Sequence, residues 1–238
     1  MSFSPPSPAP ALPRAATRQR LLAAAGEVFA QTGYRAATVR QICQRAKANV
    51  AAVNYHFGGK EQLYLAVLRE SPRAVADDPG GAAGGAAGRL RALIRALLRR
   101  LLGEGPQAWQ EKLIALEMMD PTGALDTLVA ERFQPMAAEW EQVLRALLGA
   151  QASEELLRRC GCSIVGQCVF YHHCRSVVCR LFPEQHFGAG DLDRLADHIT
   201  GFSLAALRQF ARRTTPRRGG RAARRRRAGR GPNVDSIL

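Results

Sequence analysis

The chain has 238 residues, of which 47% are hydrophobic, and its 34 Lys and Arg against 20 Asp and Glu give a formal charge of +14. The length allows one or two domains with a folded core, and no apolar run approaches the roughly 18 residues of a membrane-spanning helix. Residues 1–13 carry no Lys or Arg and contain five prolines, unlike a secretory signal peptide. We therefore expect a cytoplasmic protein without membrane association.

The charge is unevenly distributed along the chain. Residues 14–70 contain nine basic and three acidic residues, residues 71–211 contain fifteen and sixteen, and residues 212–238 contain ten Arg and one Asp. Basic ends on a neutral body predict that the ends contact a polyanion and that the body has another role. A solvated, disordered extension is an equally good interpretation of the C-terminal arginines.

The sequence divides into helical regions and segments without periodicity. Residues 1–16 are rich in proline, and we expect them to be disordered. Residues 71–88 include a Gly/Ala-rich run and are predicted to form a flexible linker. Residues 212–238 lack an apolar face and are predicted to be a disordered Arg-rich tail. The remainder has helical periodicity and no convincing strand alternation, which predicts an all-α protein.

Five helices are predicted in residues 89–211, the expected C-terminal domain. The first has an apolar face made of Leu90, Leu93, Ile94, Leu97, Leu98, Leu101 and Leu102. The second runs from Pro106 to about Met119, the third covers Gly123–Leu148 and is bent by Pro135, and the fourth is capped by Ser153 and runs to Phe182. The last has an apolar stripe made of Leu192, Leu195, Ile199, Phe202, Ala206 and Phe210.

The region 17–70 contains two short helices on a basic platform. A first helix, 18–32, ends at Gly33. Thr38 is a good N-cap for a short amphipathic helix, and Asn49 caps another after a two-residue turn. Short helices joined in this way form a helix-turn-helix, in which the second helix enters the major groove of DNA.

Specific residues in this region carry a family resemblance. The strings TVRQICQRA (38–46) and NVAAVNYHFGGK (49–60) resemble the DNA-binding domain of the tetracycline-repressor (TetR) family, over residues 17–68. The strings LIRALLRRLL (93–102), SIVGQC (163–168) and DHITGFSLAAL (197–207) are similar to the branch with a CerR-type C-terminal domain. The resemblance implies a homodimeric repressor that binds a palindromic operator in double-stranded DNA. It also implies that the operator is released when a small-molecule effector binds the domain at 89–211. The sequence does not give the identity of this effector. The last two long helices of that domain would form the dimer interface.

The resemblance also implies which residues contact DNA. Val50, Ala51, Ala52 and Asn54 would face base edges, where an amide pairs with a base and small apolar groups meet the thymine methyl. The full predicted set is Thr38, Arg40, Lys47, Asn49, Val50, Ala51, Ala52, Asn54, Tyr55, His56 and Lys60, with Thr38, Tyr55, His56 and Lys60 on phosphates. Lys47 stands where the family usually has Gly, so either the turn differs or Lys47 accepts a strained backbone and adds a phosphate contact.

Candidate effector contacts come from side chains on otherwise apolar helices. They are Trp109, Met118, Gln167, Phe170 and His173, and packing in the core is the alternative interpretation of each.

Five of the six cysteines, with His172 and His173, fall on one predicted helix, but their spacing does not gather them around a metal ion. We expect buried structural cysteines, with a thiol sensor as the alternative.

No enzyme signature is present, so we predict no catalytic residue, no metal and no cofactor. Two other classes of function stay open. One is a nucleic-acid-coating or RNA-binding protein that acts through the Arg tail, and the other is an enzyme derived from a regulator. A footprint on a defined palindrome would discriminate against both.

Overall fold

The computed structural model describes residues 14–70, 84–103 and 108–214, and within these ranges all regular structure is helical. The elements are α1 (Arg14–Ala36), α2 (Val39–Ala46), α3 (Ala51–Phe57), α4 (Lys60–Arg69), α6 (Gly85–Leu102), α7 (Ala108–Met119), α8 (Ala124–Leu128), the π-helical segment η1 (Val129–Phe133), α9 (Gln134–Leu148), α10 (Glu154–His173), α11 (Arg175–Leu181) and α12 (Ala189–Thr214). The predicted all-α fold is confirmed. No helix in these ranges is both long enough and apolar enough to span a membrane.

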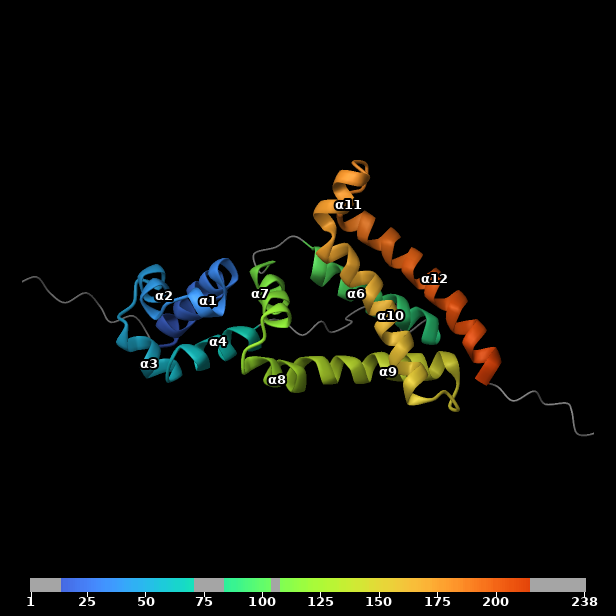
Figure 1. Cartoon of the computed structure of the whole chain (residues 1–238), viewed down its shortest axis with the longest axis horizontal. Coiled ribbons are helices and arrows are strands. Elements are labelled where there is room, and N and C mark those ends of the chain that lie inside the picture. Colours follow the sequence, from blue (N-terminus) through green and yellow to red (C-terminus); the bar gives the residue numbers. More distant parts are fainter. Residues whose placement is uncertain (1–13, 71–83, 104–107, 215–238) are drawn as a thin grey trace, which may run out of the picture.

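Two separate groups of buried apolar side chains hold these helices together. One lies among α6, α9, α10, α11 and α12. The other joins α1 to α4 with Leu113 and Ile114 of α7 and with Ala124 and Leu128 of α8. Figure 1 shows α1 to α4 at one end of the molecule, α10 to α12 at the other, and α7 and α8 between them. Although α7 and α8 follow α6 in the chain, they complete the core of the N-terminal helices.

Several predicted boundaries at the ends of segments need correction. The first helix begins at Arg14, so residues 14–16 are helical, and α6 begins at Gly85, inside the expected linker. The last helix continues to Thr214, three residues into the expected tail. Residues 1–13, 71–83, 104–107 with Pro106, and 215–238 lie outside the described residues, as do the predictions that fall on them.

Both of the longest predicted helices are interrupted. Instead of one helix over 123–148, α8 passes into η1 and then into α9, whose first turn contains Pro135. Pro135 cannot donate a backbone hydrogen bond to the preceding turn, and a π-helical turn accommodates such a defect. The predicted helix over 154–182, capped by Ser153 as expected, breaks at Cys174 into α10 and α11.

The buried face of α12 differs from the predicted stripe. Leu192 and Ile199 are buried as expected, but Phe202 is 63% exposed and its neighbour Ser203 is buried. The buried residues of this helix are Leu192, Ala196, Ile199, Thr200, Ser203 and Leu207, and α12 packs mainly beside α6. Small residues on this face permit a close approach of the two helices, so the bulky Phe202 lies on another face.

Candidate nucleic-acid interface

The first helix of the predicted helix-turn-helix begins with a capping box. The Thr38 Oγ1 accepts a hydrogen bond from Gln41 N at 3.2 Å, and the Gln41 Oε1 accepts one from Thr38 N at 2.9 Å. Each side chain satisfies a backbone donor of the other residue, so the helix start is fixed by two local bonds. The Thr38 hydroxyl also donates to Gln41 Oε1 at 2.9 Å, so a phosphate contact by this hydroxyl would compete with the cap.

The turn between the two helices has a left-handed residue. Lys47 adopts φ 49° and ψ 48°, and among the described residues it is the only one other than glycine with positive φ. The Ala48 N donates to Cys43 O at 2.9 Å, which closes the end of α2. The turn therefore has the usual backbone for this position, and Lys47 accepts a strain of about 1 kcal/mol that glycine would not have.

The second helix, α3, presents its outer face to solvent. The Asn49 Oδ1 accepts a hydrogen bond from Ala51 N at 2.9 Å and starts this helix, as predicted. Val53 is fully buried and anchors the inner face, whereas Val50 is 50% and Tyr55 66% exposed. Ala51 and Asn54 are also exposed, while Ala52 and His56 are partly buried. Val50, Ala51, Asn54 and Tyr55, which we call the α3 outer face, are thus free to contact another molecule.

Basic side chains precede and follow the α3 outer face in the chain. Arg40 and Lys47 are exposed and form no ion pair with the described acidic residues. Lys60, at the start of α4, is partly buried: its Nζ donates to Arg35 O at 3.4 Å and lies 4.6 Å from the Tyr34 ring centroid. Burial lowers the pKa of the Lys60 ammonium. A phosphate contact by Lys60 would therefore have to replace internal contacts.

Two arginines of α1 were missed in the sequence. The Arg14 guanidinium lies 5.8 Å from the Tyr55 ring centroid, and that of Arg18 lies 5.3 Å from the Phe57 ring centroid. Both bring positive charge from the start of α1 to α3. A cluster of arginines ahead of a helix-turn-helix is a signal that could have identified them, but Arg14 fell in a segment that we expected to be disordered.

The five candidate effector contacts are not brought together by the structure. Trp109 packs on α1, since a Cβ at Gly26 would lie 2.3 Å from its ring. Met118 is 46% and Phe170 54% exposed, and His173 is also exposed. Only Gln167 of these five lines a described cavity, a hollow of about 370 Å³ between α10 and α12. The predicted set therefore does not describe one pocket, because Trp109 has its partner in the N-terminal helices and three others face outward.

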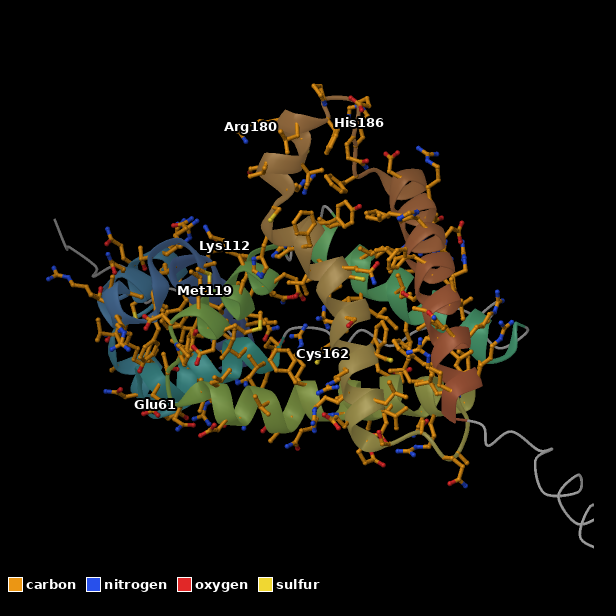
Figure 2. The ribbon with its side chains drawn as sticks, turned by 45° about the vertical axis from the view of Figure 1, so that its right-hand side comes forward. Glu61, Lys112, Met119, Cys162, Arg180 and His186 are labelled. Atoms are coloured by element: carbon orange, nitrogen blue, oxygen red, sulfur yellow. The ribbon has the colours of Figure 1, made fainter. Side chains whose placement is uncertain are left out.

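The cysteines are spread over different environments. Cys43, Cys160 and Cys168 are buried, Cys174 and Cys179 are partly buried, and Cys162 is exposed on α10, where Figure 2 labels it. Burial raises the pKa of the Cys168 thiol to about 12, so that thiol stays protonated at neutral pH. In the described part of the chain, no three His, Cys, Asp or Glu side chains form a group that could hold a metal ion.

A polar link between α4 and α7 was also missed. The Tyr64 Oη on α4 donates to Glu117 Oε2 on α7 at 2.8 Å, and both residues are buried. Burial, together with this hydrogen bond, raises the pKa of Tyr64. On the sequence, Glu117 was placed only as a residue of a helix, because its partner is 53 residues away.

Comparison with known proteins agrees with this geometry. Residues 21–67 match the model of the tetR family of bacterial regulatory proteins, and residues 86–207 match the C-terminal domain of the HTH-type transcriptional dual regulator CecR. The second match covers about half of the chain. The branch expected under the name CerR is thus the CecR type.

Individual relatives match over shorter stretches. The transcriptional repressor AcnR of Corynebacterium efficiens is 39% identical over 61 residues, 26% of this chain and 32% of that protein. The transcriptional activator FasR of Mycolicibacterium smegmatis is 47% identical over 58 residues, 24% and 26% of the two chains. The chain therefore spans about a third or less of the curated relatives it matches.

Among solved structures, HlyIIR, a hemolysin II transcriptional regulator, has a TM-score of 0.54 at 19% identity. The alignment covers 80% of this chain and 98% of HlyIIR, which shows a shared fold over most of both molecules.

Proposed function

We propose a function on the premise that the chain belongs to the tetR family of bacterial regulatory proteins and carries a CecR-type C-terminal domain. This family is one of transcriptional regulators, not of enzymes. The chain acts as a ligand-responsive repressor in the cytoplasm, where a homodimer binds a palindromic operator. Residues 17–70 bind DNA, and residues 89–211 sense the effector and form the dimer.

The observation that carries the proposal is the α3 outer face. Its four side chains are exposed while Val53 beneath them is fully buried. The helix is therefore anchored to the core by its inner face, and its outer face is accessible to DNA. A helix of this kind fits the major groove, where Asn54 can pair with a base and Val50 or Ala51 can meet a thymine methyl. Arg40 and Lys47 beside it supply positive charge for phosphates.

An exposed apolar surface on α10 and α12 supports the homodimer. Phe170 is 54% and Phe202 63% exposed, and the hollow of about 370 Å³ between the two helices is lined by Leu156 and Phe210 among others. Large apolar groups in one exposed area mark an interaction surface. A second copy is the occupant that a palindromic operator requires, because two-fold DNA symmetry mirrors a two-fold protein dimer.

Effector control follows as a shift between two states of the dimer. Recognition helices bind well only when they match successive major grooves, about 34 Å apart. The helix α4 carries this coupling, because it packs on α3 and also contacts α7 and α8. An effector that favours a different position of α4 would lower operator affinity. The loss is limited by the difference between its binding free energies for the two states of the dimer.

The test starts with selection of bound duplexes from a random pool, followed by sequencing. The repressor predicts enrichment of one inverted repeat, whereas a protein that coats nucleic acid through its arginines would enrich none. Deletion of the gene should then raise transcription next to the recovered operator; a fall would assign activation instead.

The dimer is tested by light scattering after size exclusion. Phe202→Asp should give a monomer with weak operator binding, while Leu181→Asp, on the exposed face of α11, should remain a dimer. A Phe202→Asp protein that stays dimeric would contradict the proposed interface.

A further inference from the structure

Three charged side chains are buried together where α6, α7 and η1 meet. Arg100, Glu111 and Arg132 have side chains that are only 15%, 11% and 8% exposed. The Arg132 Nη2 donates to Glu111 Oε1 at 3.0 Å, and the Arg100 Nε lies 3.3 Å from the same oxygen. Two guanidinium groups therefore share one carboxylate oxygen, and the group as a whole carries one unbalanced positive charge.

The two arginines also have nitrogen atoms without a hydrogen-bond acceptor. In the part of the chain that the structure describes, the buried Nε and Nη1 of Arg132 form no hydrogen bond, and the buried Nε of Arg100 forms an ion pair with Glu111 but no hydrogen bond. Burial, and secondarily the nearby Arg100, lower the pKa of the Arg132 guanidinium. A buried cation with unpaired donors is costly, so an additional anion at this place would be strongly favoured.

A cavity of about 240 Å³ adjoins this group between α4 and the α8–η1 segment. Arg132 forms part of its wall, Leu65, Leu68 and Leu128 provide apolar surface, and Thr127 adds a hydroxyl. Glu131 and Arg69 also line the cavity, and the Arg69 guanidinium donates to both Glu131 oxygens at 2.8 and 2.6 Å, so the charge of this acid is paired. The wall also includes η1, and π-helical turns occur often at functional sites.

We propose that Arg132, beside the positive charge of Arg100, recognises the carboxylate of a small organic acid whose apolar part occupies this cavity. A guanidinium presents parallel N–H donors that match a carboxylate, which supplies both the missing acceptors and the missing negative charge. The cavity volume suits a compact acid with a short chain or a single ring. The bound carboxylate competes with Glu111 for Arg132.

This inference names the chemical class of the effector, and for its effect on DNA it rests on the proposed function. Leu65, Leu68 and Arg69 belong to α4, so a ligand in the cavity touches the helix that carries α3. Occupancy would alter how α4 packs on α8 and η1, and thereby the spacing of the recognition helices.

Binding is tested on the full chain without DNA, by thermal unfolding and calorimetry. Hexanoate and benzoate are the probes, hexanamide and benzamide are their uncharged matches, and inorganic phosphate is the other anion. The two carboxylates should raise the unfolding temperature in a saturable manner, and the amides should not. Arg132→Met should weaken the carboxylates at least about tenfold, the loss expected for a charge-assisted pair. Arg89→Met removes an exposed arginine of α6 and should leave binding unchanged.

A second variant keeps the test decisive if Arg132→Met does not fold. Glu111→Gln removes the competing carboxylate, so it should tighten carboxylate binding. Three results would overturn the site: amides that bind as well as the acids, wild-type binding by Arg132→Met, or weaker binding by Glu111→Gln. Stabilisation by phosphate alone would overturn the assignment of the ligand as a carboxylate. Carboxylate binding that leaves operator affinity unchanged would overturn the effector role, whereas failure to bind any operator would refute the proposed function and leave the anion site standing.

Discussion

Tyr64 and Glu117, 53 positions apart in the chain, form a buried hydrogen bond of 2.8 Å between α4 and α7. The other carboxylate oxygen of Glu117 accepts from Thr122 N at 2.8 Å, so this acid is fully engaged without a cation. The contact joins the helix that supports α3 to the segment matched by the CecR-type domain. The bond therefore ties the position of α4 to that of α7.

Tyr64→Phe should destabilise the fold without a change of shape. The variant removes one donor from a buried carboxylate, and a hydrogen bond to a charged group contributes about 1.5–3 kcal/mol. Urea denaturation should show a loss of this size. Tyr171→Phe makes the same chemical change at a partly buried ring for which no hydroxyl bond is seen, and it should be nearly neutral. Equal effects of the two substitutions would mean that the Tyr64–Glu117 bond contributes little.

Gly26→Ala should disrupt the packing of α1 on α7. An added Cβ would lie 2.3 Å from the Trp109 ring, and overpacking of this kind costs about 1–3 kcal/mol. Gly161→Ala on α10 is the matched control, because its Cβ would lie 3.5 Å from Leu144, an ordinary contact. The control should gain up to about 1 kcal/mol from helix propensity. Unfolding free energies measured side by side decide the matter, and a stabilised Gly26→Ala would contradict the described packing.

Compared with glycine at the same position, Lys47 should lower the free energy of unfolding and raise the affinity for DNA. Lys47→Gly relieves the left-handed backbone and should stabilise the fold by up to about 1 kcal/mol, whereas Lys47→Gln keeps the strain. Both remove a charge, so both should reduce the salt dependence of DNA binding by about one unit for each phosphate that is no longer neutralised. Anisotropy titrations across a salt series measure this slope. A wild-type slope in both variants would exclude a phosphate contact by Lys47.

Alkaline pH should destabilise the protein through Cys168. Its thiol pKa is about 12 in the fold against an ordinary 9.0, so above pH 9 the unfolded chain loses this proton while the folded chain keeps it. The folded chain then binds more protons, and the unfolding free energy falls by about 1.4 kcal/mol per pH unit between pH 9 and 12; below pH 9 the contribution is complete. Cys168→Ala should show a shallower slope by about this amount, the rest coming from groups such as Tyr64, and Cys162→Ala should keep the wild-type slope. Identical slopes in all three proteins would contradict the burial of Cys168.

Local chemistry made much of the N-terminal fold predictable. Thr38 with Gln41, and Asn49 with the turn before it, start their helices by hydrogen bonds between near neighbours, and such bonds can be identified from spacing. The leucine pattern of α6 is equally local, and six of its seven residues are buried while Leu101 is partly buried. The left-handed Lys47 was the one open point there, because the sequence alone did not decide between strain and a different turn.

The errors concern features that depend on distant partners. An apolar stripe did not separate Phe202 from the buried face of α12, because that face is set by α6, α9 and α10, which pack on α12 from distant parts of the chain. Trp109 was assigned to a pocket because its partner Gly26 lies more than eighty residues earlier. The buried group of Arg100, Glu111 and Arg132 comes from three elements, and no motif spacing links them.

Recognition of bases by α3 is the central claim, and binding to systematically altered operators tests it most directly. Dissociation constants are measured for the wild type, Asn54→Ala and Tyr55→Phe on the selected operator and on each of its single base-pair substitutions. A bidentate amide–base pair contributes about 1–3 kcal/mol of discrimination, so Asn54→Ala should lose roughly 5- to 150-fold preference at one position of each half-site and keep the rest. Tyr55→Phe should weaken all duplexes alike. An Asn54→Ala profile with the wild-type preference at every position would contradict the assignment of α3 as the reading helix.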